Sequence, residues 1–131
     1  MNLFPKAIFI AGNDIIRGDT FIDFFEKRYA IDVNVKVIST PGHSDKNLSV
    51  MVKTKNGIVA IVGDLFEKEG DWKKEGTWEP WSFNPKKQAS NRLKIWKNSN
   101  YIIPGHGGMF KVDNSIDLEK FDQKRIDKLK S

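Results

Sequence analysis

The 131-residue sequence lacks cysteine and contains only two histidines. Without cysteine the chain has no disulfides and no thiolate metal sites, which fits a reducing compartment. Its longest apolar runs, residues 58–62 and 101–104, are strand-sized and too short to span a bilayer. Met1 is not followed by the basic and apolar regions of a secretory signal. We therefore expect a cytoplasmic or nuclear protein with no membrane partner.

The length of the chain suits one small domain over residues 1–131. Apolar residues make up 39% and charged residues 30% of the chain, the balance of an ordinary globular protein. The net charge of +5 comes mostly from dispersed lysines. This charge permits weak attraction to polyanions such as RNA, but it identifies no binding patch.

The hydrophobic pattern predicts a chain made mostly of strands. The predicted strands cover residues 7–11, 31–37, 49–54, 57–62 and 101–103. Lys55-Asn56-Gly57 is typical of a hairpin turn. Residues 13–29 give conflicting signals, and they favour either a helix capped by Asp19 or Thr20 or a packed loop.

Two helices and a long loop complete the prediction. Asn84 as N-cap and Pro85 in the first turn indicate a helix with Ala89, Leu93 and Trp96 on its apolar face. Residues 117–130 indicate a second, amphipathic helix, and residues 67–83 an aromatic loop without regular period. This order predicts an α+β fold, a sheet covered on one side by helices.

Tryptophans and lysines in and beside the aromatic loop allow two interpretations. Trp72, Trp78 and Trp81, with lysines nearby, could stack on and hold single-stranded nucleic acid. The favoured interpretation is that the tryptophans cover the sheet while the charges face water.

Both histidines share one local setting, at the end of a predicted strand. They occur in Pro41-Gly42-His43 and Pro104-Gly105-His106, and Asp64 follows a third strand. Each residue alone could be an ordinary turn residue, but three such strand ends can converge on one edge of a sheet. Imidazole and carboxylate together suit zinc, iron or manganese. We therefore predict a metal site formed by these three side chains.

Three segments are similar to the third, fourth and fifth metal-binding motifs of the metallo-β-lactamase fold: residues 40–45, 62–64 and 103–107. Residues 2–7, 63–67, the aromatic loop and the Asn84-Pro85 helix resemble the metallo-β-lactamase domain-containing protein 1 family. The resemblance covers about residues 2–112. It implies the C-terminal half of an αββα sandwich, an α/β (α+β) fold whose mixed sheet carries helices on one face.

The family's His-x-His-x-Asp-His motif has no counterpart in this sequence. The resemblance implies a two-metal site, with zinc as the expected metal and iron or manganese as alternatives. In it His43 completes one metal site and His106 the other, with Asp64 between them and Ser44 as a supporting hydroxyl beside His43. Because the motif is missing, we expect weak metal binding and little or no hydrolysis from this chain alone.

The function implied for the complete fold is metal-dependent hydrolysis. An endoribonuclease acting on RNA phosphodiesters is one candidate, and a hydrolase of small esters or thioesters is the other. A Ser44-based serine hydrolase is disfavoured because no second histidine lies beside Ser44. The alternative of a different class is a non-catalytic half-domain that pairs with another chain, either as a homodimer or with an N-terminal half.

Overall fold

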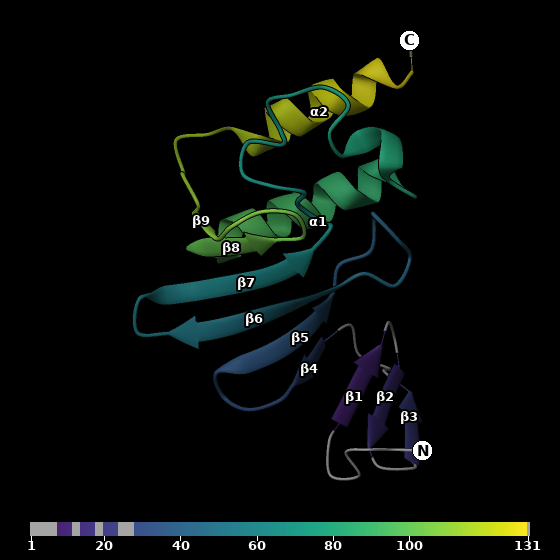
Figure 1. Cartoon of the computed structure of the whole chain (residues 1–131), viewed down its shortest axis with the longest axis vertical. Coiled ribbons are helices and arrows are strands. Elements are labelled where there is room, and N and C mark those ends of the chain that lie inside the picture. Colours follow the sequence, from purple (N-terminus) through teal and green to yellow (C-terminus); the bar gives the residue numbers. More distant parts are fainter. Residues whose placement is uncertain (1–7, 12–13, 18–19, 24–27, 131) are drawn as a thin grey trace.

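The computed structural model describes residues 8–11, 14–17, 20–23 and 28–130, with side chains from residue 30 onward (Figure 1). The first strands form an antiparallel sheet in the order β1 (Ile8–Ala11), β2 (Asp14–Arg17), β3 (Thr20–Asp23). β1 confirms the described part of the strand predicted for residues 7–11. The helix or loop predicted within residues 13–29 is wrong at Thr20–Asp23, where Thr, Phe and Ile favour a strand. Residues 24–27 lie outside the described residues.

A second, mixed sheet of six strands forms the body of the fold. Adjacent strands in this sheet are antiparallel, except for β7 and β8. These two strands are parallel, and a loop and helix α1 connect them. The strands, in their order across the sheet, are β4 (Arg28–Ala30), β5 (Val35–Ser39), β6 (Leu48–Thr54), β7 (Gly57–Gly63), β8 (Tyr101–Pro104) and β9 (Phe110–Lys111). The strands predicted for residues 49–54, 57–62 and 101–103 are confirmed.

The strand predicted for residues 31–37 is wrong in its first half, which is a turn between β4 and β5. The Asp32 carboxylate accepts hydrogen bonds from the backbone N–H groups of Asn34 and Val35, at 2.6 and 3.0 Å. Such a local bond stabilises a turn in competition with a strand ladder. Val33 is consequently 89% exposed, although it continues the apolar alternation that predicted a strand.

The hairpin between β6 and β7 is confirmed. Thr54 pairs with Gly57 across the turn, and the Thr54 hydroxyl donates to the Gly57 carbonyl at 2.7 Å. Gly57 has φ of +116°, a conformation that favours glycine. The Asn100 side chain accepts from the Ile58 N–H and thereby connects this turn to the start of β8.

Both predicted helices are present, and both lie on one side of the larger sheet (Figure 1). The Asn84 side chain caps α1 (Pro85–Asn98) by accepting from the Lys87 N–H, and Asp117 caps α2 (Leu118–Lys128) in the same way. Because each cap bond is local, the sequence was sufficient to place these helices. The predicted α+β fold, a mixed sheet with helices on one face, is confirmed.

The core lies between the helices and one face of the sheet. Buried sheet residues such as Met51, Ala60 and Ile102 meet Ile95 and Leu118 from the helices. The largest contribution is aromatic: Phe66, Trp72, Trp96 and Phe110 pack together, with ring centroids 5.0–6.5 Å apart. Burial of Trp72 and Trp78 agrees with the favoured interpretation of the aromatic loop, whereas Trp81 remains 71% exposed.

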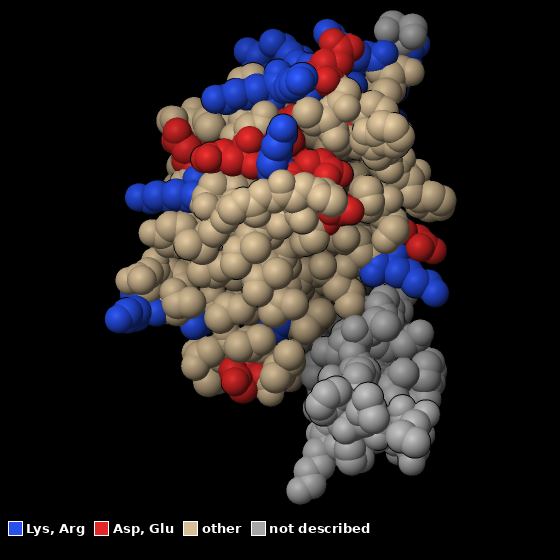
Figure 2. Space-filling view, in the orientation of Figure 1, with Lys and Arg blue, Asp and Glu red and all other residues tan. Residues whose placement is uncertain are grey.

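The opposite face of the sheet is also apolar. Cross-strand register aligns the residues of this face in two rows, Val35–Val52–Val59–Tyr101 and Val37–Val50–Ile61–Ile103. Ile61 is 41% exposed there. Figure 2 shows a largely uncharged surface over the strands, with charged side chains gathered around the helices. Among the described residues, no helix has both the length and the hydrophobicity needed to cross a membrane.

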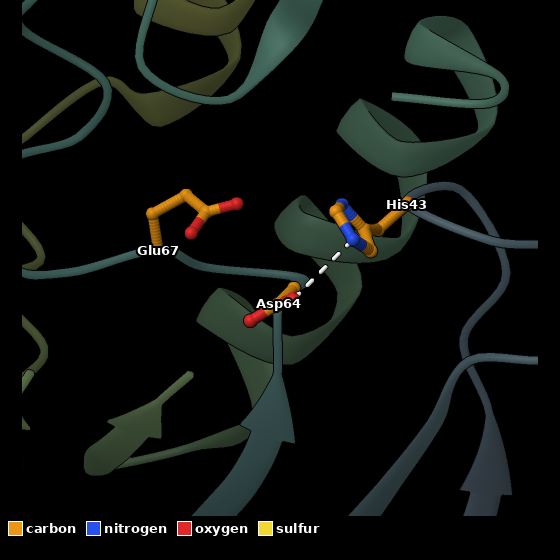
Figure 3. Close-up of side chains that lie close together, drawn as sticks. All are labelled: His43, Asp64 and Glu67. Atoms are coloured by element: carbon orange, nitrogen blue, oxygen red, sulfur yellow. Dashed lines mark ion pairs between the residues drawn. The ribbon is translucent and has the colours of Figure 1, made fainter. Parts of the chain in front are cut away.

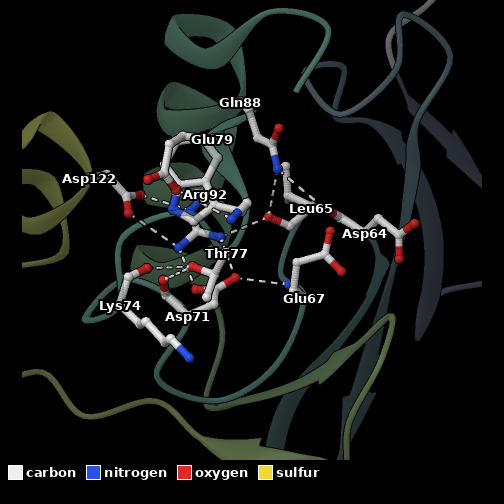
Figure 4. Close-up of polar contacts among 11 residues, drawn as sticks. Asp64, Leu65, Glu67, Asp71, Lys74, Thr77, Glu79, Gln88, Arg92 and Asp122 are labelled. Carbon is white, nitrogen blue, oxygen red and sulfur yellow. Dashed lines mark hydrogen bonds and ion pairs between the residues drawn. The ribbon is translucent and has the colours of Figure 1, made fainter. Parts of the chain in front are cut away.

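A fully buried arginine lies beside the aromatic cluster (Figure 4). Arg92 of α1 donates to Asp71 in the aromatic loop at 2.7 Å and to Asp122 of α2 at 2.8 Å. Its guanidinium stacks on Phe66 and Trp78, at 4.2 and 4.5 Å from the ring centroids. Burial acts to lower the pKa of Arg92, but attraction to Asp122 and Asp71 outweighs burial and raises it, so the side chain stays charged.

The buried stripe of α1 therefore differs from the predicted one. Gln88, Arg92, Ile95 and Trp96 are buried, whereas Ala89 and Leu93 are only partly covered. The sequence pattern assigned polar residues to solvent. In the structure Gln88 and Arg92 are buried because their donors find acceptors on segments distant in the sequence.

Replacing Arg92 with methionine should destabilise the fold strongly. The substitution leaves Asp71 and Asp122 buried without their cation, which typically costs about 3–5 kcal/mol. Urea unfolding of Arg92→Met measures the loss, with the exposed Lys94→Met on the same helix as control, expected within about 0.5 kcal/mol of wild type. Equal stabilities of the two variants would contradict this role for Arg92.

Candidate metal centre

The three predicted ligands lie at the ends of three strands that run in the same direction. β5 and β7 are each antiparallel to β6, and β8 is parallel to β7, so β5, β7 and β8 end at one edge of the sheet. Asp64 follows β7 directly, and His43 and His106 follow β5 and β8 through short Pro-Gly segments. The predicted convergence on one edge is therefore present in the fold.

The Asp64 carboxylate lies between the two imidazoles. Its Oδ2 is 3.3 Å from His43 Nε2, and its Oδ1 is 3.0 Å from His106 Nε2. The side chains of His43 and Asp64 are 28% and 33% exposed, and that of His106 is 66% exposed. The structure thus brings all three residues together where solvent can reach them.

Close backbone packing fixes His106 relative to Asp64. Gly105 donates its N–H to the Phe66 carbonyl at 3.0 Å, and His106 donates its N–H to the Glu67 carbonyl at 2.9 Å. A Cβ atom at Gly105 would overlap Asp64 Oδ1, so only glycine allows this approach. The Pro-Gly sequence before His106 therefore brings the imidazole and the carboxylate into contact.

A separate set of hydrogen bonds fixes the segment before His43. The buried Thr40 hydroxyl bonds with Ser49 of β6 at 2.7 Å, and the Asn47 amide donates to Thr40 Oγ1 at 3.0 Å. Further along, the Gly42 carbonyl accepts from the Asn84 N–H at 2.9 Å. These bonds secure the turn to both the sheet and the start of α1.

Glu67 is a fourth side chain at the centre, and the sequence analysis did not identify it. Ligand atoms of His43, Asp64 and Glu67 all lie within 4.8 Å of one another (Figure 3). Glu67 Oε2 is also 3.5 Å from His106 Nε2. The one sequence feature that could have indicated a ligand is its position three residues after Asp64. The sequence analysis assigned Glu67 to the aromatic loop instead.

The surroundings of Glu67 disfavour its charged form. Burial raises the pKa of this carboxyl, and the neighbouring Asp64 carboxylate raises it further. His106 and His43 act in the opposite direction without cancelling the shift. Two carboxyls and two imidazoles so close together would be stabilised by a cation among them.

Ser44 does not join this cluster through any described side-chain contact. The residue is exposed, and its backbone carbonyl accepts from the Gly42 N–H at 2.9 Å. The supporting role expected for its hydroxyl stays a prediction.

The donor set suits a divalent metal ion. Imidazole nitrogen and carboxylate oxygen are the ligands that zinc, iron and manganese accept in cysteine-free sites. His43 Nδ1 is buried and has no hydrogen-bond partner among the described residues, while His43 Nε2 faces Asp64. His43, Asp64 and Glu67 therefore fit one metal ion by both chemistry and proximity, and His106 lies beside this group, 3.0 Å from Asp64 and 3.5 Å from Glu67.

Two relatives named metallo-β-lactamase domain-containing protein 1 match most of the chain. The Xenopus laevis protein is 36% identical over 86% of this chain and 49% of its own length. The Mus musculus protein is 38% identical over 86% of this chain and 44% of its own length. No family model matches the sequence. The chain thus spans about half the length of the curated relatives it matches.

A solved structure supports the same assignment. An N-acyl homoserine lactone hydrolase, with its product bound at the catalytic metal centre, superimposes with a TM-score of 0.50 and 26% identity. The match covers 63% of this chain and 34% of that protein. The chain therefore belongs to the metallo-β-lactamase-fold family, and it corresponds to about half of the metallo-β-lactamase domain-containing protein 1 relatives that it matches.

Proposed function

We propose that this chain carries the His43, Asp64 and His106 part of a metal-dependent hydrolase centre, with zinc as the expected metal and iron or manganese as alternatives. One observation carries the proposal: each oxygen of the Asp64 carboxylate faces a different histidine. Asp64 together with the two imidazoles would hold divalent metal at this position. Two metal ions need further ligands, and the His-x-His-x-Asp-His motif that supplies them in the family is absent from this sequence.

Hydrolysis at this centre would need both a bound metal ion and the side chains that hold it. A bound divalent ion supplies Lewis acidity and activates water near neutral pH. His43, Asp64 and His106 hold and orient the ion, and the strand ends from which they project limit their movement. Glu67, whose ligand oxygen lies within 4.8 Å of ligand atoms of His43 and Asp64, would supply a further oxygen ligand.

Small carboxylic esters or lactones are the substrates we favour over RNA. The solved lactone hydrolase that the chain resembles acts on an ester-type bond. Phe83 is 74% exposed, and its N–H donates to the His43 carbonyl at 3.3 Å, so an exposed apolar residue is bonded to the backbone of a proposed ligand. On the face drawn in Figure 2, lysines and arginines are interspersed with acidic residues, whereas a nucleic acid backbone favours a continuous basic surface.

Removing a proposed ligand should abolish stoichiometric metal binding. We expect His43→Ala, Asp64→Asn and His106→Ala each to lower zinc affinity by more than about tenfold, because each removes a donor. Calorimetric titration with zinc, paired with elemental analysis, measures the change. Asp45→Asn, an exposed acid beside the site, is the control and should bind as wild type. Retention of zinc by both histidine variants would show that the ligands are elsewhere.

Substrate preference can be measured on the same zinc-loaded chain. We expect slow hydrolysis of a small lactone, absent from Asp64→Asn, and no cleavage of single-stranded RNA. Cleavage of RNA that depends on Asp64 would instead favour the endoribonuclease expected from the resemblance. Zinc binding without turnover of either substrate would favour the non-catalytic alternative.

That second candidate, a half-domain that pairs with another chain, is supported by the apolar rows on the face of the sheet away from the helices, where most members are partly exposed and Val37 is buried. Soluble monomers rarely expose a broad apolar face. Ile61, 41% exposed, lies within these rows on β7. A second copy of the chain could cover this face in a homodimer, although two copies would still lack the missing motif.

Pairing through this face should be visible in the oligomeric state. We expect sedimentation to show self-association that Ile61→Lys weakens, because a charge would be buried at the interface. Leu129→Lys, a similarly exposed apolar residue after α2, is the matched control and should associate as wild type. A monomeric wild-type chain would exclude the homodimer.

A further inference from the structure

Helix α1 contacts both of the segments that carry the predicted ligands. Gln88, Asn91 and Arg92 lie on one face of the helix, at the i, i+3 and i+4 spacing that brings side chains together. The Asn91 amide donates to the Pro41 carbonyl at 2.6 Å, two residues before His43. The other two side chains reach the segment that begins at Asp64.

Gln88 is the point at which the two segments meet the helix. Its amide nitrogen donates to the carbonyl oxygens of Asp64 and Leu65, both at 3.2 Å. On its other side the helix backbone packs against Gly42, where an added Cβ atom would overlap Gln88. Gln88 is fully buried, so these contacts are shielded from water.

Arg92, one turn further along, extends the same support to Glu67. Its Nη1 donates to the Leu65 carbonyl at 2.9 Å and to Asp71 Oδ2 at 2.9 Å. The same Asp71 oxygen accepts from the Glu67 N–H at 2.8 Å. Figure 4 shows the resulting chain of polar contacts from α1 to the Asp64–Glu67 segment.

Two buried atoms beside this support lack a partner among the described residues. They are Gln88 Oε1, an acceptor, and His43 Nδ1. A histidine that binds metal through Nε2 carries its proton on Nδ1 and ordinarily donates it to an acceptor, directly or through water. The two atoms do not bond to each other in the structure, and the contact between Gln88 and the His43 segment is the packing of the Gln88 backbone and Cβ against Gly42.

We propose that Gln88 is a positioning residue of the metal centre: its amide nitrogen holds the Asp64–Leu65 carbonyls, and its backbone packs against Gly42, the residue before His43. Arg92 and Asp71 secure the far end of the same segment at Glu67. One helix thus sets the distance between the imidazole and the two carboxylates. The proposal rests on the metal centre proposed above and adds a residue that binds no metal itself.

Gln88→Met tests this role, because methionine retains the length of the side chain and removes its hydrogen bonds. We expect faster amide hydrogen exchange at Leu65 and Glu67 in the metal-free chain. Zinc affinity should fall by about 10- to 100-fold, the range typical of residues that support metal ligands. Ile95→Val is the matched control: Ile95 is buried on the same helix within the hydrophobic core, and the variant should leave exchange at Leu65 and Glu67 and zinc affinity unchanged.

The readouts separate this inference from the proposed function. Unchanged exchange and unchanged zinc affinity in Gln88→Met would overturn the inference while leaving the metal centre intact. Equal effects in Ile95→Val would overturn it too, because general destabilisation would then explain them. A wild-type chain that binds no zinc would overturn the proposed function and with it the metal-supporting role. Gln88→Asn, which draws the amide back from the carbonyls, is a milder second variant with the same expected direction.

Discussion

A buried guanidinium with its donors matched to acceptors is the constraint on which much of this structure depends. Arg92 can remain in the core only while Asp71, Asp122 and the Leu65 carbonyl all stay in place. These partners belong to the aromatic loop, α2 and the segment after β7. The Arg92 guanidinium thus fixes three separate parts of the chain relative to one another. The rings of Phe66 and Trp78 cover it and exclude water, which would weaken its hydrogen bonds.

The proposed metal centre would use the rigidity that this arrangement provides. A sheet edge alone brings His43, Asp64 and His106 near one another, because their strands share a direction. Gly105 packs so closely against Asp64 that an added Cβ atom would overlap the Asp64 carboxylate. The backbone around both residues must therefore keep its position. The centre is therefore best regarded as the exposed side of a continuous polar network whose other side is the core.

The sequence predicted those features whose causes are local. Strand ends marked by Pro-Gly located His43 and His106, and single cap residues located both helices. The turn at Asp32 was missed because two hydrogen bonds to the Asp32 carboxylate outweighed the apolar alternation of Ile31 and Val33. Glu67 and Gln88 were missed because they meet His106 and the Leu65 carbonyl, which lie more than twenty positions away. No pattern within a helix or loop shows such distant contacts.

The parallel pairing of β7 and β8 has a consequence for the order of folding. Parallel neighbours cannot be joined by a tight turn, so residues 64–100 must cross over the sheet, form α1 and return before β8 can pair. Closing such a loop lowers the entropy of the chain, and only the long-range contacts that form on closure offset this cost. Asp64 and His106 therefore meet only when the whole segment between them has crossed over and β8 has paired with β7. A metal ion would find its ligands gathered already, and it would stabilise a finished fold rather than nucleate one.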